Sequence, residues 1–379
     1  MIRVAVIGAG YIGPIHLEAL ARIGGVKVTT VIDANGELAA KAAAKFNVES
    51  SGTDFRTAIR NPEIDVIHNC TPNKYHFEIT KDALEAGKQV MSEKPLAMTL
   101  DQAKQLVELA EKKRAVNGID FCYRYYPVVQ EMAVRVRRGD AGNVRMVSGS
   151  YLQDWLSRET DWTWRLLKSE SGESNISADL GSHWFDLIQF VTGLRVQSVM
   201  ADLATLIPVR KMPKKQVLAF EQVGETETQD VRVELEDYSA TLFRLSNGVP
   251  GSFTTSQVCS GRKSDTEFQI YGSDCSFAWN HRESNRLWIG HRNRPNEELI
   301  ENATLQDAST ARYASLPAGH PLGYHDAVLN LFRDFYRCVE SGSQNGSGIP
   351  DFQTGLDEMK ILQAVLESNR TRSWIEVKE

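Results

Sequence analysis

The 379-residue sequence lacks the features of an exported or membrane-embedded protein. Its five cysteines are odd in number and widely spaced, with no CxxC pair, which argues against a disulfide framework and against a zinc site. No apolar run approaches the roughly 18 residues that span a bilayer. The first residues carry no basic segment of the kind that begins a signal peptide. We therefore expect a reduced, cytoplasmic protein without a membrane partner.

A concentrated positive charge is also missing. The 43 basic and 49 acidic residues give a net charge of -6, whereas nucleic-acid binding needs a basic face. We therefore expect no nucleic-acid partner. The hydrophobic fraction of 42% and the charged fraction of 24% are those of a globular protein, long enough for two domains with separate cores. The sequence shows no internal repeat or low-complexity linker.

The first third of the sequence alternates short apolar runs with segments of helical spacing. Five runs lack polar alternation, which is typical of strands buried on both faces: IRVAVIG, VKVTTVID, IDVIHNCT, QVM and AVNGID. Between them, residues 12–23, 34–46, 75–86 and 100–113 have helical spacing. These strand-helix-strand units predict a doubly wound parallel sheet of Rossmann type in a first domain of residues 1–122.

The glycine pattern GxGxxG directly follows the first predicted strand and opens a helix, as a dinucleotide-binding loop does. A glycine lets a pyrophosphate approach the backbone, and the helix N-terminus favours its negative charge. The alternative is a tight turn that needs glycine for its own geometry. The residues expected to border the cofactor here are Gly8, Gly10, Tyr11, Ile12 and Gly13.

Asp33 ends the second predicted strand, 20 residues after Gly13. At this spacing a carboxylate accepts hydrogen bonds from the adenosine ribose hydroxyls, whereas a 2'-phosphate would meet like charge. The sequence therefore favours NAD over NADP as the cofactor. The alternative is that Asp33 only caps the following helix.

Two later strand ends should lie at the same edge of the sheet, because ligands of open parallel sheets bind outside the carboxyl ends of the strands. The first is NCTPNKYH and the second is VMSEKP. The first could equally be a Pro-Asn turn that starts a helix. The residues expected to border the cofactor at these ends are Thr71, Pro72, Asn73, His76, Glu93 and Lys94.

The second part of the sequence, residues 123–379, has a different pattern of apolar and polar residues. A helical stretch ends at Arg138, and VRMVSGSYLQDW has the pattern of a strand. The segments VRVELED, YSATLFRLSNG, VPGSFTTSQV, TEFQIYG, CSFAWN and RLWIGHR alternate apolar and polar residues, and Asn247-Gly248 marks a hairpin turn. We predict an α+β domain on a large open, mainly antiparallel sheet, with helices near His183 and over residues 326–339 and 355–367.

The stretch SADLGSHWFDLIQFVTG carries the most informative polar residues of this second domain. Asp179 and His183 are four residues apart and should share a helix face, with Asp186 three residues further on. A histidine that titrates near neutral pH can take a hydroxyl proton while a carboxylate holds it in place. The pair could instead be an ordinary surface pair or a helix cap. Metal ligation is not favoured, because the sequence offers no third ligand cluster.

A third group of residues is suited to binding a ring that carries hydroxyls. The stretch YLQDWLSRETDWTWR is dense in aromatic and polar side chains, which stack on sugar rings and hydrogen-bond to them. Packing at a sheet edge explains the same composition. The substrate-binding candidates, beside Lys94, Asp179 and His183, are Tyr151, Gln153, Asp154, Trp155, Trp162, Trp164 and Arg165, and weaker ones are Tyr123, Arg124, His320 and Tyr324.

Together, GxGxxG, TPNxxH, EKP and DxGxH resemble the glucose-fructose oxidoreductase, inositol dehydrogenase and rhizopine catabolism family, Gfo/Idh/MocA. The resemblance covers nearly the whole chain, including YRYYP, TWR and PDFQTGLDEMKILQAVLESN. It implies a Rossmann domain joined to an α+β domain whose sheet forms a homodimer or homotetramer. It also implies a Lys94-Pro95 bond that is often cis, and Lys94, Asp179 and His183 as catalytic residues around the substrate.

The activity implied by the resemblance is reversible oxidation of a secondary hydroxyl with NAD. His183 is expected to take the hydroxyl proton, Lys94 to stabilise the developing alkoxide, and Asp179 to orient substrate or lysine. The expected substrate is a sugar, an anhydrosugar such as levoglucosan, a glycoside or an inositol. Two alternatives stay open: a sensor that binds NAD and a sugar without turnover, and a glycoside hydrolase that recycles NAD internally.

Overall fold

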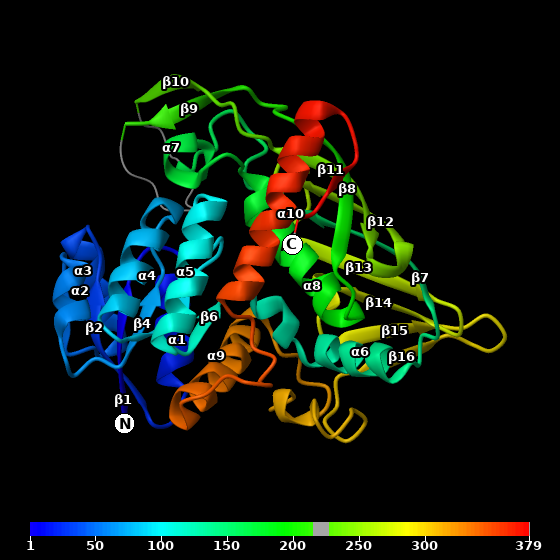
Figure 1. Ribbon diagram of the computed structural model, residues 1–379, viewed down its shortest axis with the longest axis horizontal. Coiled ribbons are helices and arrows are strands. Elements are labelled where there is room, and N and C mark those ends of the chain that lie inside the picture. The colour runs from blue at the N-terminus through cyan, green and yellow to red at the C-terminus, as the bar shows by residue number, and fades with distance from the viewer. Residues whose placement is uncertain (215–226, 379) are drawn as a thin grey trace. The chain divides into compact units, whose positions relative to one another are not determined.

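The computed structural model describes residues 1–214 and 227–378 (Figure 1), and the chain divides into two compact units. Unit 1 comprises Met1–Asp120, Ser169–Glu173 and Val328–Met359. Unit 2 comprises Phe121–Lys168, Ser174–Ala327 and Lys360–Glu379. The chain first leaves unit 1 after Asp120, two residues before the predicted boundary at 122/123, and two later segments belong to unit 1 again. No helix of the described part is long and apolar enough to cross a membrane.

Unit 1 is built on a six-stranded sheet in the order β3-β2-β1-β4-β5-β6, with every neighbouring pair parallel. This is the strand order of a doubly wound dinucleotide-binding fold, as the sequence predicted. The central strands β4 and β5 are almost wholly buried, which explains their lack of polar alternation. The strands are β1 (Ile2–Ile7), β2 (Val26–Ile32), β3 (Ser50–Gly52), β4 (Val66–Asn69), β5 (Gln89–Ser92) and β6 (Asn117–Ile119).

The helices of unit 1 begin close to their predicted positions because their caps are local. The Asn35 side chain accepts hydrogen bonds from two backbone amides at the start of α2, and Thr99 caps α5 in the same way. The short elements β3 and α3 were not predicted. The helices are α1 (Gly13–Ala21), α2 (Gly36–Phe46), α3 (Phe55–Arg60), α4 (His76–Glu85) and α5 (Leu100–Lys113); α9 (Tyr324–Ser341) and α10 (Phe352–Thr371) each span both units, and α9 belongs to unit 1 from Val328 onward.

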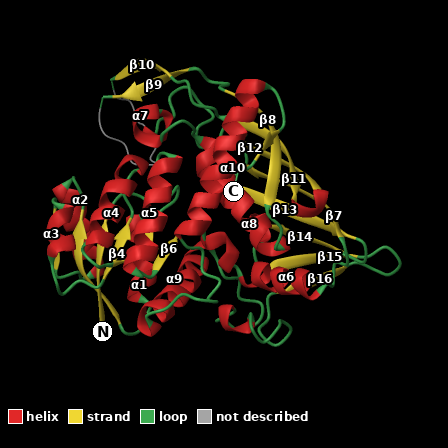
Figure 2. Cartoon of the chain, in the orientation of Figure 1, coloured by secondary structure: helices red, strands yellow, loops and turns green. Residues whose placement is uncertain are grey.

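Unit 2 is built on a nine-stranded sheet in the order β16-β15-β14-β13-β7-β12-β11-β8-β17 (Figure 2). Only β7 and β12 pair in parallel, so the sheet is mainly antiparallel, as predicted. Asn247 and Gly248 both have positive φ and form the predicted hairpin turn between β11 and β12. The strands are β7 (Val144–Leu152), β8 (Val196–Ala204), β11 (Tyr238–Leu245), β12 (Pro250–Ser256), β13 (Asp265–Gly272), β14 (Ser276–Asn280), β15 (Arg286–Gly290), β16 (Glu297–Ile300) and β17 (Ile375–Glu376).

One predicted strand is largely wrong. In VRVELED only Val231 and Arg232 belong to a strand, β10 (Thr228–Arg232), which pairs with β9 (Val209–Pro213) outside the main sheet. In the remainder, Val233 packs with Leu156 and Leu166 in a buried cluster, and Leu235, Glu236 and Asp237 are all buried. The alternation of residue types in VRVELED therefore did not mark a strand of the sheet. The strands β8, β16 and β17 were not predicted.

The helices α6 (Pro127–Arg138) and α8 (Ser182–Thr192) belong to unit 2, and α7 (Lys168–Ser171) is a single turn. The Trp184 side chain of α8 is fully buried and stacks on Phe253 of β12, with ring centroids 4.3 Å apart. Its indole N–H donates to the Glu267 carbonyl of β13 at 3.0 Å. This single side chain therefore joins α8 to two strands of the sheet.

We expect Trp184→Ala to lower the free energy of unfolding by about 3–5 kcal/mol, because it removes a buried ring and leaves a cavity. The control is Trp374→Ala, since Trp374 is 43% exposed and the Arg244 guanidinium lies over its ring. Loss of such an exposed contact should cost about 0.5–1 kcal/mol. Urea denaturation midpoints measure both, and equal losses would show that Trp184 does not anchor α8.

Candidate functional site

The glycine loop of unit 1 has the space that a dinucleotide needs. An added Cβ at Gly10 would meet nothing within 4 Å, so the backbone is open to a ligand there. At Gly13 the same atom would lie 2.1 Å from the Gly8 carbonyl oxygen, so only glycine permits this close turn. The first amides of α1 follow directly, and such amides favour a phosphate. Tyr11 is exposed and Ile12 half-buried in the same loop.

Asp33 lies at the end of β2 beside this loop. Its carboxylate accepts hydrogen bonds from the backbone amides of Ala9 at 2.7 Å and Asn35 at 2.8 Å. The cap of α2 is Asn35, so the alternative role of Asp33 as the helix cap does not hold. A carboxylate fixed by two backbone amides at this position suits ribose hydroxyls, so the loop and Asp33 together fit NAD.

The residues after β4 form a compact polar turn. The ring nitrogens of His76 lie 2.8 Å from the Thr71 carbonyl oxygen and 2.6 Å from the Pro95 carbonyl oxygen. His76 thus connects the turn to the loop that follows β5. Asn73 is buried, and its amide donates to the Ser171 carbonyl at 3.2 Å, while Pro72 precedes it half-buried. His76 and Asn73 therefore shape this edge within unit 1.

The loop after β5 carries Glu93 and Lys94. The Lys94-Pro95 peptide bond is cis, as the family resemblance implied. Glu93 is buried and Lys94 half-buried. Burial raises the pKa of Glu93, as does the charge of Asp120, while His16 and Lys94 act in the opposite direction. A cationic lysine thus leaves the strand end next to a buried carboxylate.

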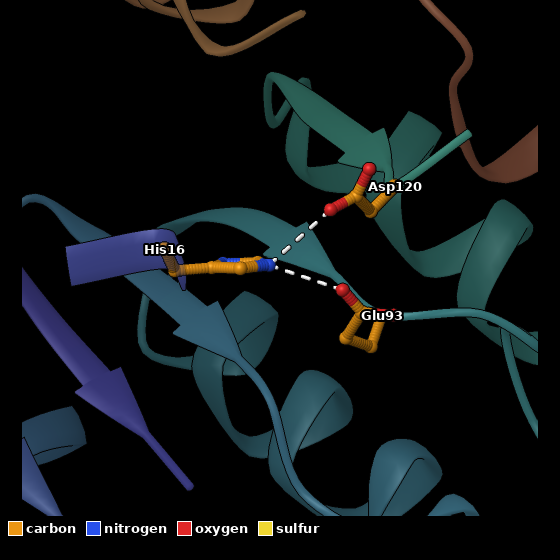
Figure 3. A group of neighbouring side chains, drawn as sticks. All are labelled: His16, Glu93 and Asp120. Atoms are coloured by element: carbon orange, nitrogen blue, oxygen red, sulfur yellow. Dashed lines mark hydrogen bonds and ion pairs between the residues drawn. The ribbon is translucent and has the colours of Figure 1, made fainter. Parts of the chain in front are cut away.

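Two buried residues that the sequence did not single out lie against Glu93 (Figure 3). His16 of α1 places Nε2 3.0 Å from Glu93 Oε1 and 3.3 Å from Asp120 Oδ2. His16 is fully buried and Asp120 is 1% exposed. A histidine on the buried face of an otherwise apolar helix, among Ile15, Leu17, Ala19 and Leu20, is the sequence signal that could have found it.

These three groups are of types that also bind metal ions, and their ligand atoms lie within 4.8 Å of one another. The separation of 3.0 Å between His16 Nε2 and Glu93 Oε1 is that of a hydrogen bond, with a proton between the two atoms. A metal ligand would offer a lone pair at that nitrogen instead. The geometry is therefore that of a charge cluster.

In unit 2, Asp179 and His183 lie across a junction between two kinds of helix. Asp179 belongs to a π-helical turn, Ser177–Gly181, and His183 to the first turn of α8. Asp179 and His183 therefore do not lie on the single regular helix that the sequence predicted. Single π-helical turns of this kind are frequent at functional sites. Gln257 donates to Asp179 Oδ2 at 3.1 Å, and Arg165 Nε lies 3.5 Å from Oδ1. Two side chains from other segments therefore hold the carboxylate.

The surroundings of His183 are aromatic. Its ring lies edge-on to Tyr123 at 5.0 Å and to Phe121 at 5.7 Å between centroids. The Tyr123 and Tyr151 hydroxyls are 2.7 Å apart, and burial raises the pKa of Tyr151 to about 12. Both phenols therefore stay protonated at neutral pH and can act as hydrogen-bond donors. The structure brings Tyr123, Tyr151, Asp179, Arg165 and His183 into one region of unit 2.

Other predicted substrate-binding residues of unit 2 have partners elsewhere. Arg124 makes a bidentate ion pair with the buried Asp186, which is a structural contact within the unit. Lys263 Nζ lies 2.6 Å from Asp154 Oδ2. His320 is exposed, and its Nδ1 lies 3.0 Å from the Pro317 carbonyl oxygen. Trp164 lies under the Arg165 guanidinium, 4.5 Å from its ring centroid, and so stays close to Asp179.

Comparison with known families agrees with this division of the chain. Residues 2–121 match the model of the oxidoreductase family with an NAD-binding Rossmann fold, and residues 129–278 match the Gfo/Idh/MocA C-terminal domain. The two matches occur in the expected order along one chain. NAD is therefore the cofactor of this fold, as the glycine loop and Asp33 predicted.

Among similar proteins, levoglucosan dehydrogenase from Pseudarthrobacter phenanthrenivorans is 30% identical over 389 residues, covering 99% of this chain and 98% of its own. D-glucoside 3-dehydrogenase from Escherichia coli is 31% identical over 202 residues, covering 53% and 57%. A levoglucosan dehydrogenase structure in complex with NADH and levoglucosan superposes with a TM-score of 0.89 at 28% identity, covering all of both chains.

These relatives are named dehydrogenases, and the first of them aligns with this chain from end to end. The predicted fold class, the enzyme class and the cofactor are thereby confirmed. The chain belongs to the Gfo/Idh/MocA family of NAD-dependent oxidoreductases.

Proposed function

We propose that this protein oxidises one secondary hydroxyl of a pyranose-like ring to a ketone, with NAD as the hydride acceptor. The observation that carries the proposal is the group around His183: a histidine, the held carboxylate of Asp179 and two protonated phenols in one region. Such a group suits an uncharged substrate with several hydroxyls. The end-to-end similarity to a levoglucosan dehydrogenase supports an anhydrosugar or glycoside over an inositol.

In this proposal, a named residue performs each part of the reaction. His183 takes the proton from the reacting hydroxyl as the carbon loses its hydride, and returns it in the reverse direction. Lys94 donates a hydrogen bond to the same oxygen and stabilises its developing negative charge. Asp179, held between Arg165 and Gln257, accepts a hydrogen bond from a neighbouring ring hydroxyl. NAD, when bound, supplies the hydride acceptor.

Ring recognition is assigned to the aromatic and polar side chains near that group. Tyr151 and Tyr123 donate hydrogen bonds to ring hydroxyls, and the Trp164 face packs against the ring. Arg165 holds both Trp164 and Asp179 in place. Because Arg124 and Asp154 are engaged in ion pairs, they have a smaller part in recognition than Tyr151.

The proposal is tested by offering purified protein NAD and a panel of levoglucosan, glucosides, free sugars and inositols while absorbance of NADH is followed. We expect NADH to accumulate with one ring class, fastest with an anhydrosugar or glucoside, and more slowly when NADP replaces NAD. A panel that gives no NADH although NAD binds would contradict the dehydrogenase. Cleavage of a glycoside without net NADH would identify the hydrolase alternative, and binding of a sugar without either product would identify the sensor.

We expect Lys94→Ala to lower kcat by at least about 100-fold, because a positioned group in the transition state contributes about 10²- to 10⁴-fold. NAD affinity, measured by calorimetry, should stay close to that of the wild type. The matched control is Lys27→Ala, which removes an exposed lysine paired with Glu49 on the same unit. An unchanged kcat in the Lys94 variant would remove this lysine from the mechanism.

We further propose that two copies of the chain associate through the open face of the unit 2 sheet. Strand register places Leu242, Met146 and Trp288 on one face of the sheet, because directly paired residues of neighbouring strands face the same side. The pairings run from Leu242 through Ser252, Ser148, Gln269 and Ala278 to Trp288. Met146 lies two residues from Ser148 on the same strand and so faces the same side. All three side chains are at least 39% exposed. Large apolar side chains gathered on one sheet face are typical of an interface.

The expected assembly is a dimer or tetramer that a charge on this face disrupts. Light scattering after size exclusion should give a multiple of the 42.4 kDa chain for the wild type and a smaller species for Leu242→Glu with Trp288→Glu. Leu206→Glu is the control, because Leu206 is also exposed but lies outside the sheet. A monomeric wild-type protein, or double and control variants that behave alike, would contradict association through this face.

A further inference from the structure

His16 of α1 is surrounded by titratable groups from several other elements of unit 1. Glu93 and Asp120 face its Nε2 from the ends of β5 and β6. Its Nδ1 lies 2.9 Å from Nδ1 of His68 on β4. His68 Nε2 lies 2.9 Å from the Tyr336 hydroxyl on α9, and Cys70 follows β4 next to His16. All these residues belong to unit 1.

The rest of the environment is apolar. The Phe332 ring lies 4.7 Å from the His16 ring and 4.9 Å from the His68 ring, both edge-on. His16 and His68 are each fully buried. Two carboxylates in such a medium cannot both stay ionised without a nearby positive charge. A proton held within the cluster is therefore favoured.

The contacts indicate where that proton lies. A proton shared among these groups prefers the imidazole, whose ordinary pKa of 6.5 exceeds the 4.5 of a glutamate. Burial alone would lower the pKa of His16, but Cys70 and the contacts with Asp120 and Glu93 raise it well above its ordinary value. Because burial also raises the pKa of the Cys70 thiol, the two carboxylates supply the negative charge that holds the proton on His16. Burial and the charge of His16 lower the pKa of His68. A charged His16 and a neutral His68 together supply one proton for each hydrogen bond between His16, His68 and Tyr336.

We propose that His16 is a positioning residue that is protonated at neutral pH, and that its imidazolium holds the Glu93 and Asp120 carboxylates together and thereby fixes the strand end from which Lys94 extends. Nε2–H donates to Glu93 and forms an ion pair with Asp120 (Figure 3). Nδ1–H donates to His68, whose Nε2–H donates to Tyr336. The role assigned to Lys94 here rests on the proposed function, whereas the charge state of His16 does not.

Backbone hydrogen bonds connect the charged cluster around His16 to the segment that carries Lys94. The Asp120 amide donates to the Ser92 carbonyl at 2.9 Å, and the Glu93 amide donates to the Asn69 carbonyl at 2.9 Å. The ends of β4, β5 and β6 are thus joined just before Lys94. Without a cation at His16, the two carboxylates would repel each other or take up a proton, and either change would shift Glu93. A shift of about 1 Å at a catalytic group can cost up to about 100-fold in rate.

The sign of the pH dependence follows from the raised pKa. The stabilisation from the His16 charge is fully present below the unfolded-state pKa of about 6.5 and is lost as pH rises through the higher folded-state value. Between these two values the folded protein retains a proton that the unfolded chain releases. Stability should therefore decline on the alkaline side of pH 6.5, and no further gain is expected below it.

The first test reads the proton directly by ¹⁵N NMR of the histidine side chains between pH 6 and 9. We expect a histidine signal with both ring protons above pH 7.5 that disappears in His16→Gln. In Asp120→Asn the same histidine should lose its second proton at lower pH. A neutral His16 at pH 7 in the wild type would overturn the proposal, whether or not a substrate has been found.

The second test uses His16→Gln, which keeps a donor near Nε2 but removes the charge. We expect kcat on the substrate found in the panel to fall about 10- to 100-fold, with the KM for NAD little changed. Amide hydrogen exchange of residues 92–97 should become faster. The matched control is His291→Gln, where the histidine also contacts a glutamate, with Nε2 2.9 Å from Glu297 Oε1, but lies between β15 and β16.

The outcomes separate this inference from the function on which it rests. Wild-type turnover together with an unchanged kcat and unchanged exchange in His16→Gln would overturn the positioning role and leave the dehydrogenase intact. A wild-type protein that oxidises no member of the panel would remove the function, and exchange of residues 92–97 would then decide alone whether His16 holds the strand end.

Discussion

Parallel strand order is the constraint on which unit 1 depends. In the order β3-β2-β1-β4-β5-β6, every strand delivers its last residue to the same edge of the sheet. The glycine loop, Asp33, the turn around His76 and the Glu93-Lys94 pair each follow one of these strands. Segments up to about 100 residues apart in sequence are therefore brought together by backbone hydrogen bonds alone. The side chains only refine a site whose position the topology has already set.

Charge accumulates at that edge, because it receives both the helix N-terminus of α1 and several acidic residues. Asp33 is balanced by backbone amides, which solvate it without a counter-ion. Glu93 and Asp120 are buried deeper and have His16 between them. If His16 carries a proton, Lys94 adds a second positive charge and the four groups are neutral together. Lys94 then remains able to stabilise a developing alkoxide, since Glu93 already has a partner.

The sequence predicted the elements that depend on local residue patterns, but it did not predict the side-chain contacts between residues far apart in the chain. The strands β1, β2, β4, β5 and β6 were found because each is an apolar run between turn residues. The contacts of His16 with Glu93 and Asp120 were not predicted, because they join residues that are 77 and 104 positions apart. The ion pair of Arg124 with Asp186, across 62 positions, could not be predicted either, and the expected part of Arg124 in substrate binding stays a prediction. A composition of aromatics and arginines cannot tell which arginine already has an acidic partner.

The strand β7 shows how unit 2 combines two proposed roles in nine residues. Successive side chains of a strand face opposite sides of the sheet. Val147, Gly149 and Tyr151 therefore face α8 and the His183 region, where an added Cβ at Gly149 would come within 3.0 Å of the Trp184 ring. Met146 and Ser148 face the open side, where association is proposed. A one-residue shift of register would exchange the two sets. Because Tyr151 and Met146 lie on one strand, any contact that fixes its register on the open face also fixes Tyr151 relative to Tyr123 on the other.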